Sequence, residues 1–216
     1  KIPKNPKFMK FIQIVNEEAK KVNMKVDVTD GLRTPLDQAN RMYNNFWGTA
    51  GRDGKKSSTA ATRRSYLVNL YKNKKYFPNI EKIADILEKS GGARTGSSRT
   101  VAIRESVKIT GYWTASHIRG DAFDFSMDAS KDGKMIGPWA PKGSSKEKRM
   151  AITKKRRSIS GPLVLQVLRA TESCANINIL VENNHFHVSV KSILDKPGAV
   201  ASAVVQTTKG APDWAA

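Results

Sequence analysis

The chain has 216 residues, of which 38 are lysine or arginine and 19 are aspartate or glutamate, so its formal net charge is +19. Hydrophobic residues make up 39% of the sequence, which is enough for one sizeable core and excludes a fully disordered chain. No apolar run reaches the roughly 18 residues of a membrane span, and a single cysteine, Cys174, excludes a disulfide framework. The charge favours an anionic partner: nucleic acid, a bacterial wall or an acidic membrane surface.

Hydrophobic periodicity predicts a mixture of helices and strands along the chain. In chain order we expect a helix over 6–22, a strand over 24–29, helices over 34–46 and 78–89, a strand over 122–127, a helix over 161–171, and a hairpin of strands over 177–182 and 185–190. The residues at 93–100 are rich in Gly, Ser and Arg and predict a loop. The tail, 197–216, has little periodicity and is expected to be either an arm that packs on a partner chain or a loosely ordered segment.

The excess positive charge lies mostly in two stretches that are rich in Gly, Ser and Lys. Residues 52–75 include eight basic side chains and one acidic one, and residues 129–157 include ten basic and two acidic ones. We predict that both stretches are surface insertions on a nearly neutral core. They serve either as solubilising loops or as an electrostatic footprint for a polyanion.

The strand over 122–127 carries a carboxylate where a fully buried strand would not. Side chains alternate across a strand, so Phe123, Phe125 and Met127 should face the core. Asp124 then points to the opposite face with the small residues Ala122 and Ser126. One face of this strand is therefore expected to carry chemistry.

The hairpin repeats this pattern around the turn residues Asn183-Asn184, because Asn tolerates the positive φ of a two-residue turn. Residues that flank such a turn are cross-strand partners on one face. Glu182, His185 and His187 should therefore share a face. The core face should be formed by Ile179, Val181, Phe186 and Val188.

The chain has only three histidines, His117, His185 and His187. Together with the carboxylates of Asp124 and Glu182, they supply a ligand set for zinc and an acid–base residue beside it. The alternative is three unrelated histidines on the surface or in a core.

Three segments resemble those of a known enzyme family. The run His117-Ile118-Arg119-Gly120-Asp121-Ala122-Phe123-Asp124-Phe125 is similar to the His-x-x-Gly-x-Ala-x-Asp-Phe signature of zinc D-Ala-D-Ala metallopeptidases, a group that includes L-alanyl-D-glutamate endolysins. The later His185-Phe186-His187-Val188 resembles the paired-histidine motif of the same group and of murein endopeptidases. Upstream, Asp30-Gly31-Leu32-Arg33-Thr34-Pro35-Leu36-Asp37-Gln38 resembles the Ser-Gly-Tyr-Arg-Ser…Gln segment. The segments occur in the family's order.

The resemblance implies a role for each matching residue. His117, Asp124 and His187 would be the zinc ligands, and His185 would lie beside the reacting water. Arg33 would steady the substrate carbonyl or the oxyanion.

The chain departs from the family at the position of the catalytic base. Many endolysin-type members carry an acid three residues before the ligand histidine, where this chain has Asn184. Glu182 instead lies three residues before His185, so His185 could be read as the ligand; we prefer His187. The general base is left open between His185 and Glu182, which both face the site by strand alternation.

The function expected from this resemblance is a zinc-dependent peptidase that cuts stem peptides or cross-links of bacterial peptidoglycan. The basic stretches would hold the enzyme on anionic wall polymers, and the tail could contact other virion subunits. This suits a phage lytic or virion-associated enzyme, with a secreted or periplasmic bacterial enzyme as the alternative.

Two other readings compete with the peptidase. The same scaffold with a non-catalytic zinc site, as in hedgehog-type domains, could serve as a virion-structural protein or bind wall polymer or nucleic acid. A purely nucleic-acid-binding protein is disfavoured, because no such motif is present and aromatics do not interleave the basic runs.

The expected fold class is α+β: a small, mostly antiparallel sheet with the zinc site on one face and helices packed on the other. We expect one metallopeptidase domain over 1–196, with the basic stretches inserted into it, followed by the tail.

Overall fold

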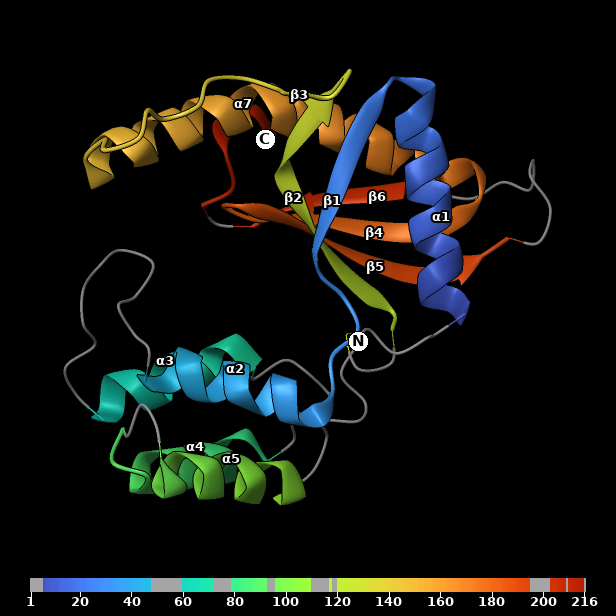
Figure 1. The fold of residues 1–216 in the computed structure, drawn as a ribbon. Coiled ribbons are helices and arrows are strands. Elements are labelled where there is room, and N and C mark those ends of the chain that lie inside the picture. The colour runs from blue at the N-terminus through green and yellow to red at the C-terminus, as the bar shows by residue number, and fades with distance from the viewer. Residues whose placement is uncertain are drawn as a thin grey trace. The chain divides into compact units, whose positions relative to one another are not determined.

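The computed structural model describes residues 6–47, 60–71, 79–92, 96–109, 117, 120–194, 203–208 and 210–215. Its contacts divide the chain into two compact units, one formed by Lys1–Leu32 with Gly120–Ala216 and the other by Arg33–Arg119. The first unit contains a sheet and two long helices, and the second is helical where it is described (Figure 1). The fold class is α+β, as predicted.

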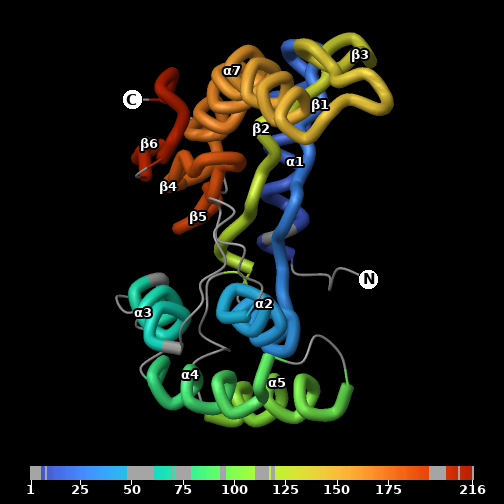
Figure 2. Tube along the Cα trace, turned by 90° about the vertical axis from the view of Figure 1, so that its left-hand side faces the viewer, coloured from blue at the N-terminus to red at the C-terminus, as the bar shows by residue number. Residues whose placement is uncertain are grey.

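The sheet of the first unit is mixed but mostly antiparallel. Its strands are β1 (Met24–Asp30), β2 (Ala122–Lys131), β3 (Lys134–Met135), β4 (Ala175–Val181), β5 (His185–Ile193) and β6 (Ala203–Thr207). The strand order is β1-β2-β5-β4-β6 (Figure 2), with β3 paired to β2. Among the strands that the structure describes, β4 and β6 are parallel and the other pairs are antiparallel. The three predicted strand regions, near 24, 122 and the hairpin, are confirmed.

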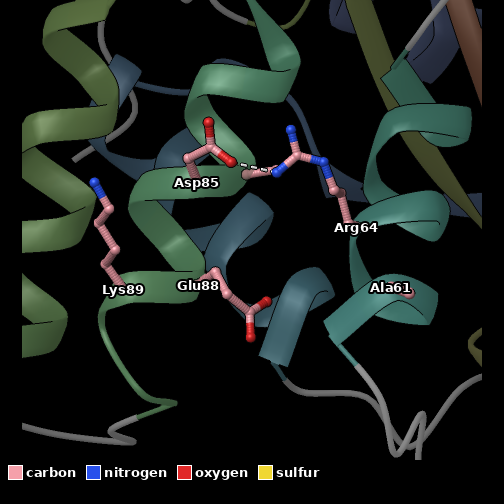
Figure 3. A pocket seen from close by; sticks show the side chains of 6 residues that line it. Ala61, Arg64, Asp85, Glu88 and Lys89 are labelled. Atoms are coloured by element: carbon pink, nitrogen blue, oxygen red, sulfur yellow. Dashed lines mark hydrogen bonds and ion pairs between the residues drawn. The ribbon is translucent and has the colours of Figure 1, made fainter.

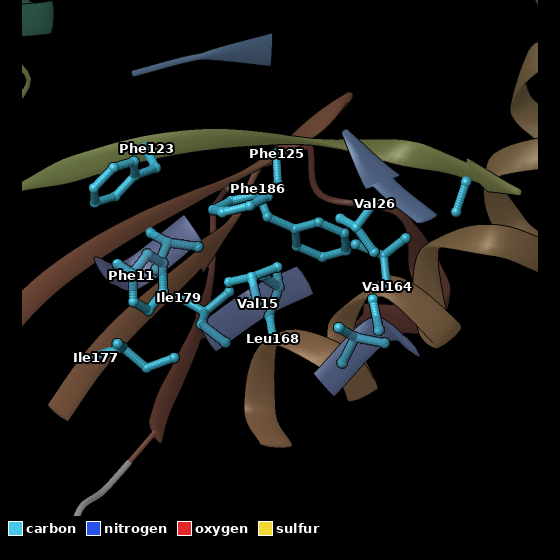
Figure 4. Packing of buried hydrophobic residues seen from close by; sticks show 14 of the residues in the cluster. Phe11, Val15, Val26, Phe123, Phe125, Val164, Leu168, Ile177, Ile179 and Phe186 are labelled. Atoms are coloured by element: carbon cyan, nitrogen blue, oxygen red, sulfur yellow. The ribbon is translucent and has the colours of Figure 1, made fainter. Parts of the chain in front are cut away.

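The core of this unit lies between the sheet and the helices α1 (Pro6–Lys21) and α7 (Lys146–Ala170). Figure 4 shows side chains from both helices pointing toward those of the strands. The ring centroids of Phe11 and Phe123 are 5.2 Å apart, and Phe186 is buried in the same cluster. All of the core-facing residues predicted for β2 and the hairpin are buried. Because side chains alternate, their neighbours in each strand occupy the sheet face opposite α1 and α7.

The helical unit contains α2 (Pro35–Trp47), α3 (Ala60–Tyr71), α4 (Ile80–Lys89) and α5 (Ser97–Ile109). It has its own core, to which α4 contributes Ile80, Ile83, Ala84 and Leu87, spaced along one helical face. Across the α3–α4 contact, Arg64 pairs with Asp85 (Figure 3). It also pairs with Glu81. None of the helices in the described part of the chain has the length and hydropathy of a membrane span.

The two basic stretches contain more helix than predicted. The helix expected over 161–171 begins at Lys146, where the Ser145 hydroxyl accepts the backbone N–H of Lys148 at 3.2 Å. Its first turns are exposed and have no apolar stripe, so periodicity gives no signal for them. In the stretch over 52–75, residues 60–71 form α3, and the rest lies outside the described residues.

Two further expectations are corrected. The loop expected over 93–100 ends early, because α5 begins at Ser97. In the tail, which was expected to be an arm or loosely ordered, residues 203–207 form β6 alongside β4, and η3 (Asp213–Ala215) places Trp214 against Phe186 with 6.2 Å between ring centroids. A short helix, η2 (Thr171–Ser173), follows α7.

Candidate metal centre

The pairing of β2 with β5 places the first two members of the site opposite each other. Asp124 is the register partner of His187, and Ser126 is the partner of His185. The Asp124 Oδ1 and His187 Nδ1 atoms are 2.8 Å apart. This contact follows from strand alternation, since both side chains leave the sheet on the face opposite the helices.

Asp124 is held by its backbone on both sides. Its carbonyl oxygen accepts the hydroxyl hydrogen of Thr29 from β1 at 3.1 Å, while β5 pairs with it on the other side. The residue is 7% exposed as a whole, and its side chain is 11% exposed. A buried carboxylate is costly without a partner, so its contact with His187 and its position in this group are consistent with a site that holds a cation.

The start of β2 is anchored from α1. Lys7 Nζ donates to Asp121 Oδ1 at 2.6 Å and to the Val190 carbonyl oxygen at 3.1 Å, and the Val190 N–H donates to the Asp121 carbonyl oxygen at 2.7 Å. These bonds tie together the ends of β2 and β5 that lead to Asp124 and His187. Sequence reasoning missed Lys7, because nothing in a lysine 114 residues away marks its partner.

His117 completes the predicted ligand group. One ligand atom from each of His117, Asp124 and His187 lies within 4.8 Å of the others, and His117 is 7% exposed. The carbonyl oxygen of His117 accepts the backbone N–H of Arg33 at 3.1 Å, which holds the backbone at His117 itself. The structure therefore brings together the three residues that the sequence proposed as metal ligands.

This donor set suits zinc chemically. Two imidazoles and one carboxylate form a common three-residue set for a catalytic zinc ion, which keeps a fourth position for water or substrate. Ligand atoms about 2.1 Å from one tetrahedral ion lie about 3.4 Å apart. The observed separations, 2.8 Å for one pair and up to 4.8 Å for the group, bracket that value. A metal ion can thus be held by small side-chain movements, while the identity of the metal is not given by the geometry.

His185 and Glu182 lie next to this group, as the hairpin predicted. His185 Nε2 is 3.5 Å from Glu182 Oε2 and 3.7 Å from Asp124 Oδ1. The other ring nitrogen, Nδ1, is 2.9 Å from Asn184 Oδ1. The turn itself is formed by a bond from the Glu182 N–H to the His185 carbonyl oxygen at 3.0 Å, although neither asparagine in it has a positive φ. His185 therefore lies beside the predicted ligand Asp124, and Glu182 lies beside His185.

A further hydroxyl borders the site. Ser189 Oγ is 3.5 Å from His187 Nε2, the ring nitrogen that does not face Asp124. Groups that contact the second nitrogen of a ligand histidine orient its ring and fix its tautomer. The signal for Ser189 was present in the sequence, because it continues the alternation of His185 and His187 along one strand face.

Arg33 lies at the start of the helical unit, where its Nη1 donates to Gln38 Oε1 at 2.9 Å. Gln38 in turn donates to the Tyr71 hydroxyl at 3.4 Å. The predicted role of Arg33 toward a substrate carbonyl stays a prediction.

Comparison of the chain with protein-family models, with curated proteins and with solved structures gives no match.

Proposed function

We propose that this protein is a zinc-dependent peptidase and that its substrate is a peptide of bacterial peptidoglycan. The observation that carries the proposal is the convergence of His117, Asp124 and His187, with a carboxylate and an imidazole from the same hairpin beside them. A purely structural zinc site needs four protein ligands and no free acid–base group at its edge. The three ligands with a carboxylate and an imidazole beside them therefore support a site that acts on water and a carbonyl.

A zinc ion bound by the three ligands would supply Lewis-acid polarisation of a peptide carbonyl and activation of water at neutral pH. The chain's own residues supply the proton transfers. Glu182 or His185, which contact each other at 3.5 Å, would accept a proton from water and return it to the leaving amine. Asn184 restrains the His185 ring through Nδ1, so that Nε2 is directed toward Glu182 and Asp124.

The choice of peptidoglycan is supported by two features of the sequence. The motifs around His117 and His185 resemble those of murein peptidases, and the order of the three segments is the same. A net charge of +19 favours accumulation on an anionic surface, and bacterial walls carry such charge.

The test combines metal analysis with murein digestion. Purified protein is expected to contain about one zinc per chain. It should release peptide fragments from purified murein, detected by mass spectrometry, and lose this activity on chelation and regain it with zinc. Full activity after complete removal of metal would contradict the proposal.

Two matched variants then separate catalysis from metal binding. Glu182→Gln and His185→Asn leave the three predicted ligands intact, so both proteins should retain zinc, while at least one loses about a hundredfold or more in peptide release. Glu172→Gln, at an exposed position in η2, makes the same chemical change away from the site and should leave activity unchanged. If both site variants keep zinc and full function, the metal site is non-catalytic, and the virion-structural or binding reading takes its place.

A further inference from the structure

Where the structure describes the two basic stretches, their cations have different surroundings. In the first, Arg63 pairs with Glu88 at 2.6 Å and lies 4.2 Å from the centre of the Trp47 ring, and its neighbour Arg64 pairs with acids of α4. These arginines hold α3 against the rest of the helical unit. Their charge is therefore already balanced within the fold.

The second stretch instead presents a surface of unbalanced cations. We call it the α7 basic surface, and it consists of Lys142, Lys146, Lys148, Arg149, Lys154 and Lys155. All six residues are exposed, and among the residues that the structure describes none of their side chains has an ion-pair or hydrogen-bond partner. By contrast, Arg156 and Arg157 at the end of the same run both contact Asp128.

These cations do not stabilise the helix that carries them. Three of them lie in the first turn of α7, where the helix dipole disfavours positive charge, and like charges spaced along a helix repel one another. The one acid of this turn, Glu147, is engaged with the helix start, since a hydrogen bond from its own backbone N–H lowers the pKa of its carboxyl. The cations of the α7 basic surface are therefore neither paired within the fold nor stabilising to it. We expect such charges to bind an external anion.

The distribution of apolar residues indicates what kind of anion this is. Met150 is 63% exposed and Ile159 is also exposed, but nine positions at about 100° each put them on opposite sides of the helix. A helix that lies on a membrane gathers its apolar residues on one side, so this surface is not of that type. Lysine is the predominant cation here, and it binds phosphate as a point charge without requiring a fixed geometry.

We infer that the α7 basic surface binds a linear polyol-phosphate polymer of the bacterial envelope. The choice of this polymer rests on the proposed function, because such a polymer would lie next to the peptidoglycan that the site cleaves. α7 covers the sheet face opposite Asp124 and His187, so a polymer bound to α7 would lie on the other side of the sheet from these two side chains. Attachment to the polymer raises the local concentration of the substrate without any new contact at the site.

The inference is tested by binding of the full chain to purified poly(glycerol phosphate) over a range of salt concentrations. The variant Lys148→Gln/Lys154→Gln/Lys155→Gln removes three cations of the surface. Its control, Lys20→Gln/Lys82→Gln/Lys89→Gln, removes three exposed lysines from other helices and gives the same net charge. The surface variant should bind roughly tenfold to a hundredfold more weakly at low salt and show a salt slope reduced by about 2, with the control close to the parent.

Equal losses in the two variants would overturn the inference, because binding would then follow net charge alone. Tighter binding of a thymidine oligonucleotide than of poly(glycerol phosphate) would also overturn it, in favour of nucleic acid, as would preferential binding to vesicles containing phosphatidylglycerol. The measurement needs no bond cleavage. If the parent chain releases peptide but does not bind the polymer, the result counts against this surface alone. If the parent chain binds the polymer but releases no peptide, the result counts against the peptidase alone.

Discussion

Asp124 Oδ1 and His187 Nδ1 lie 2.8 Å apart, although 63 residues separate them in the chain. The contact is made by two adjacent antiparallel strands whose registers are set by the buried residues on the opposite face, Phe123, Phe125, Phe186 and Val188. The geometry of the candidate site is thus a consequence of core packing, and changes to the ligands themselves should affect metal binding far more than folding.

Asp124→Asn tests this separation directly. Asparagine has nearly the same shape as aspartate but no charge, so we expect the affinity for zinc to fall. Substituting a residue that contacts a metal ligand without binding the metal typically lowers metal affinity about 10- to 100-fold, and the loss in Asp124→Asn should be larger. Metal affinity is measured by competition with a chelator, and folding by circular dichroism. Asp132→Asn, in the exposed β2–β3 turn, is the control and should bind zinc as the parent does. Unchanged affinity in Asp124→Asn would remove Asp124 from the ligand set.

Gly161 is required by the docking of Trp214. A Cβ atom at this position would overlap the Trp214 ring, so Gly161→Ala should destabilise the protein by about 1–3 kcal/mol in denaturant unfolding. In a Trp214→Ala background the clash is gone, and alanine should then stabilise α7 by up to about 1 kcal/mol through its helix propensity. The same sign of effect in both backgrounds would show that Trp214 does not dock there.

The buried end of the α7 cation run has a structural role. Arg156 Nε and Nη2 donate to the two carboxylate oxygens of Asp128 at 2.8 and 3.2 Å, and its guanidinium lies 4.5 Å from the centre of the Trp139 ring. Arg156→Ala should lower the free energy of unfolding by about 3 kcal/mol. This is the lower end of the range for breaking a buried ion pair, and we choose it because Arg157 still contacts Asp128 in the variant. Arg149→Ala, which removes an exposed and unpaired cation, should change stability by less than about 0.5 kcal/mol. Equal costs for the two variants would contradict this division of roles.

Tyr71 gives the helical unit a dependence on alkaline pH. Burial raises the pKa of the Tyr71 phenol above its usual value of 10.0, so the folded state retains a proton that the unfolded state loses. The contribution of Tyr71 to the free energy of unfolding is therefore constant below about pH 9, and the free energy of unfolding falls as the pH rises through and above 10. Tyr71→Phe should lose less stability over that range than the parent, as measured by unfolding at pH 9 to about 11. Tyr66→Phe, at a largely exposed position, is the control and should follow the parent curve.

The parts of the fold that could be read from the sequence are those in which burial alternates or repeats. The β2 and hairpin strands showed which side chains face the core, and the structure confirms those faces because one side of the sheet is covered by α1 and α7. The same alternation placed Glu182, His185 and His187 together. His117 was predicted as a metal ligand from its motif alone, because no periodic pattern connects it with β2.

The parts that could not be read are those stabilised by contacts between distant residues. The first turns of α7 are exposed on every side, so no apolar pattern marks them as helix. The residues of β6 do not alternate between hydrophobic and polar side chains. They form a strand because the backbone of β4 has an unpaired edge with which they pair. The partners Lys7 and Asp121 carry the commonest surface charges in the chain, and only the folded structure shows that they meet.

The two-residue connection Asn183-Asn184 limits how this protein can evolve. Inserting or deleting one residue there would rotate the following strand by half a period and carry both hairpin histidines to the helix-packed face of the sheet. Substitution at 183 carries no such penalty, since Asn183 needs no unusual backbone conformation, whereas Asn184 also contacts the His185 ring. Descendants and ancestors of this chain should therefore differ freely in the identity of residue 183 while keeping an unvarying interval of eight positions from Ile179 to His187.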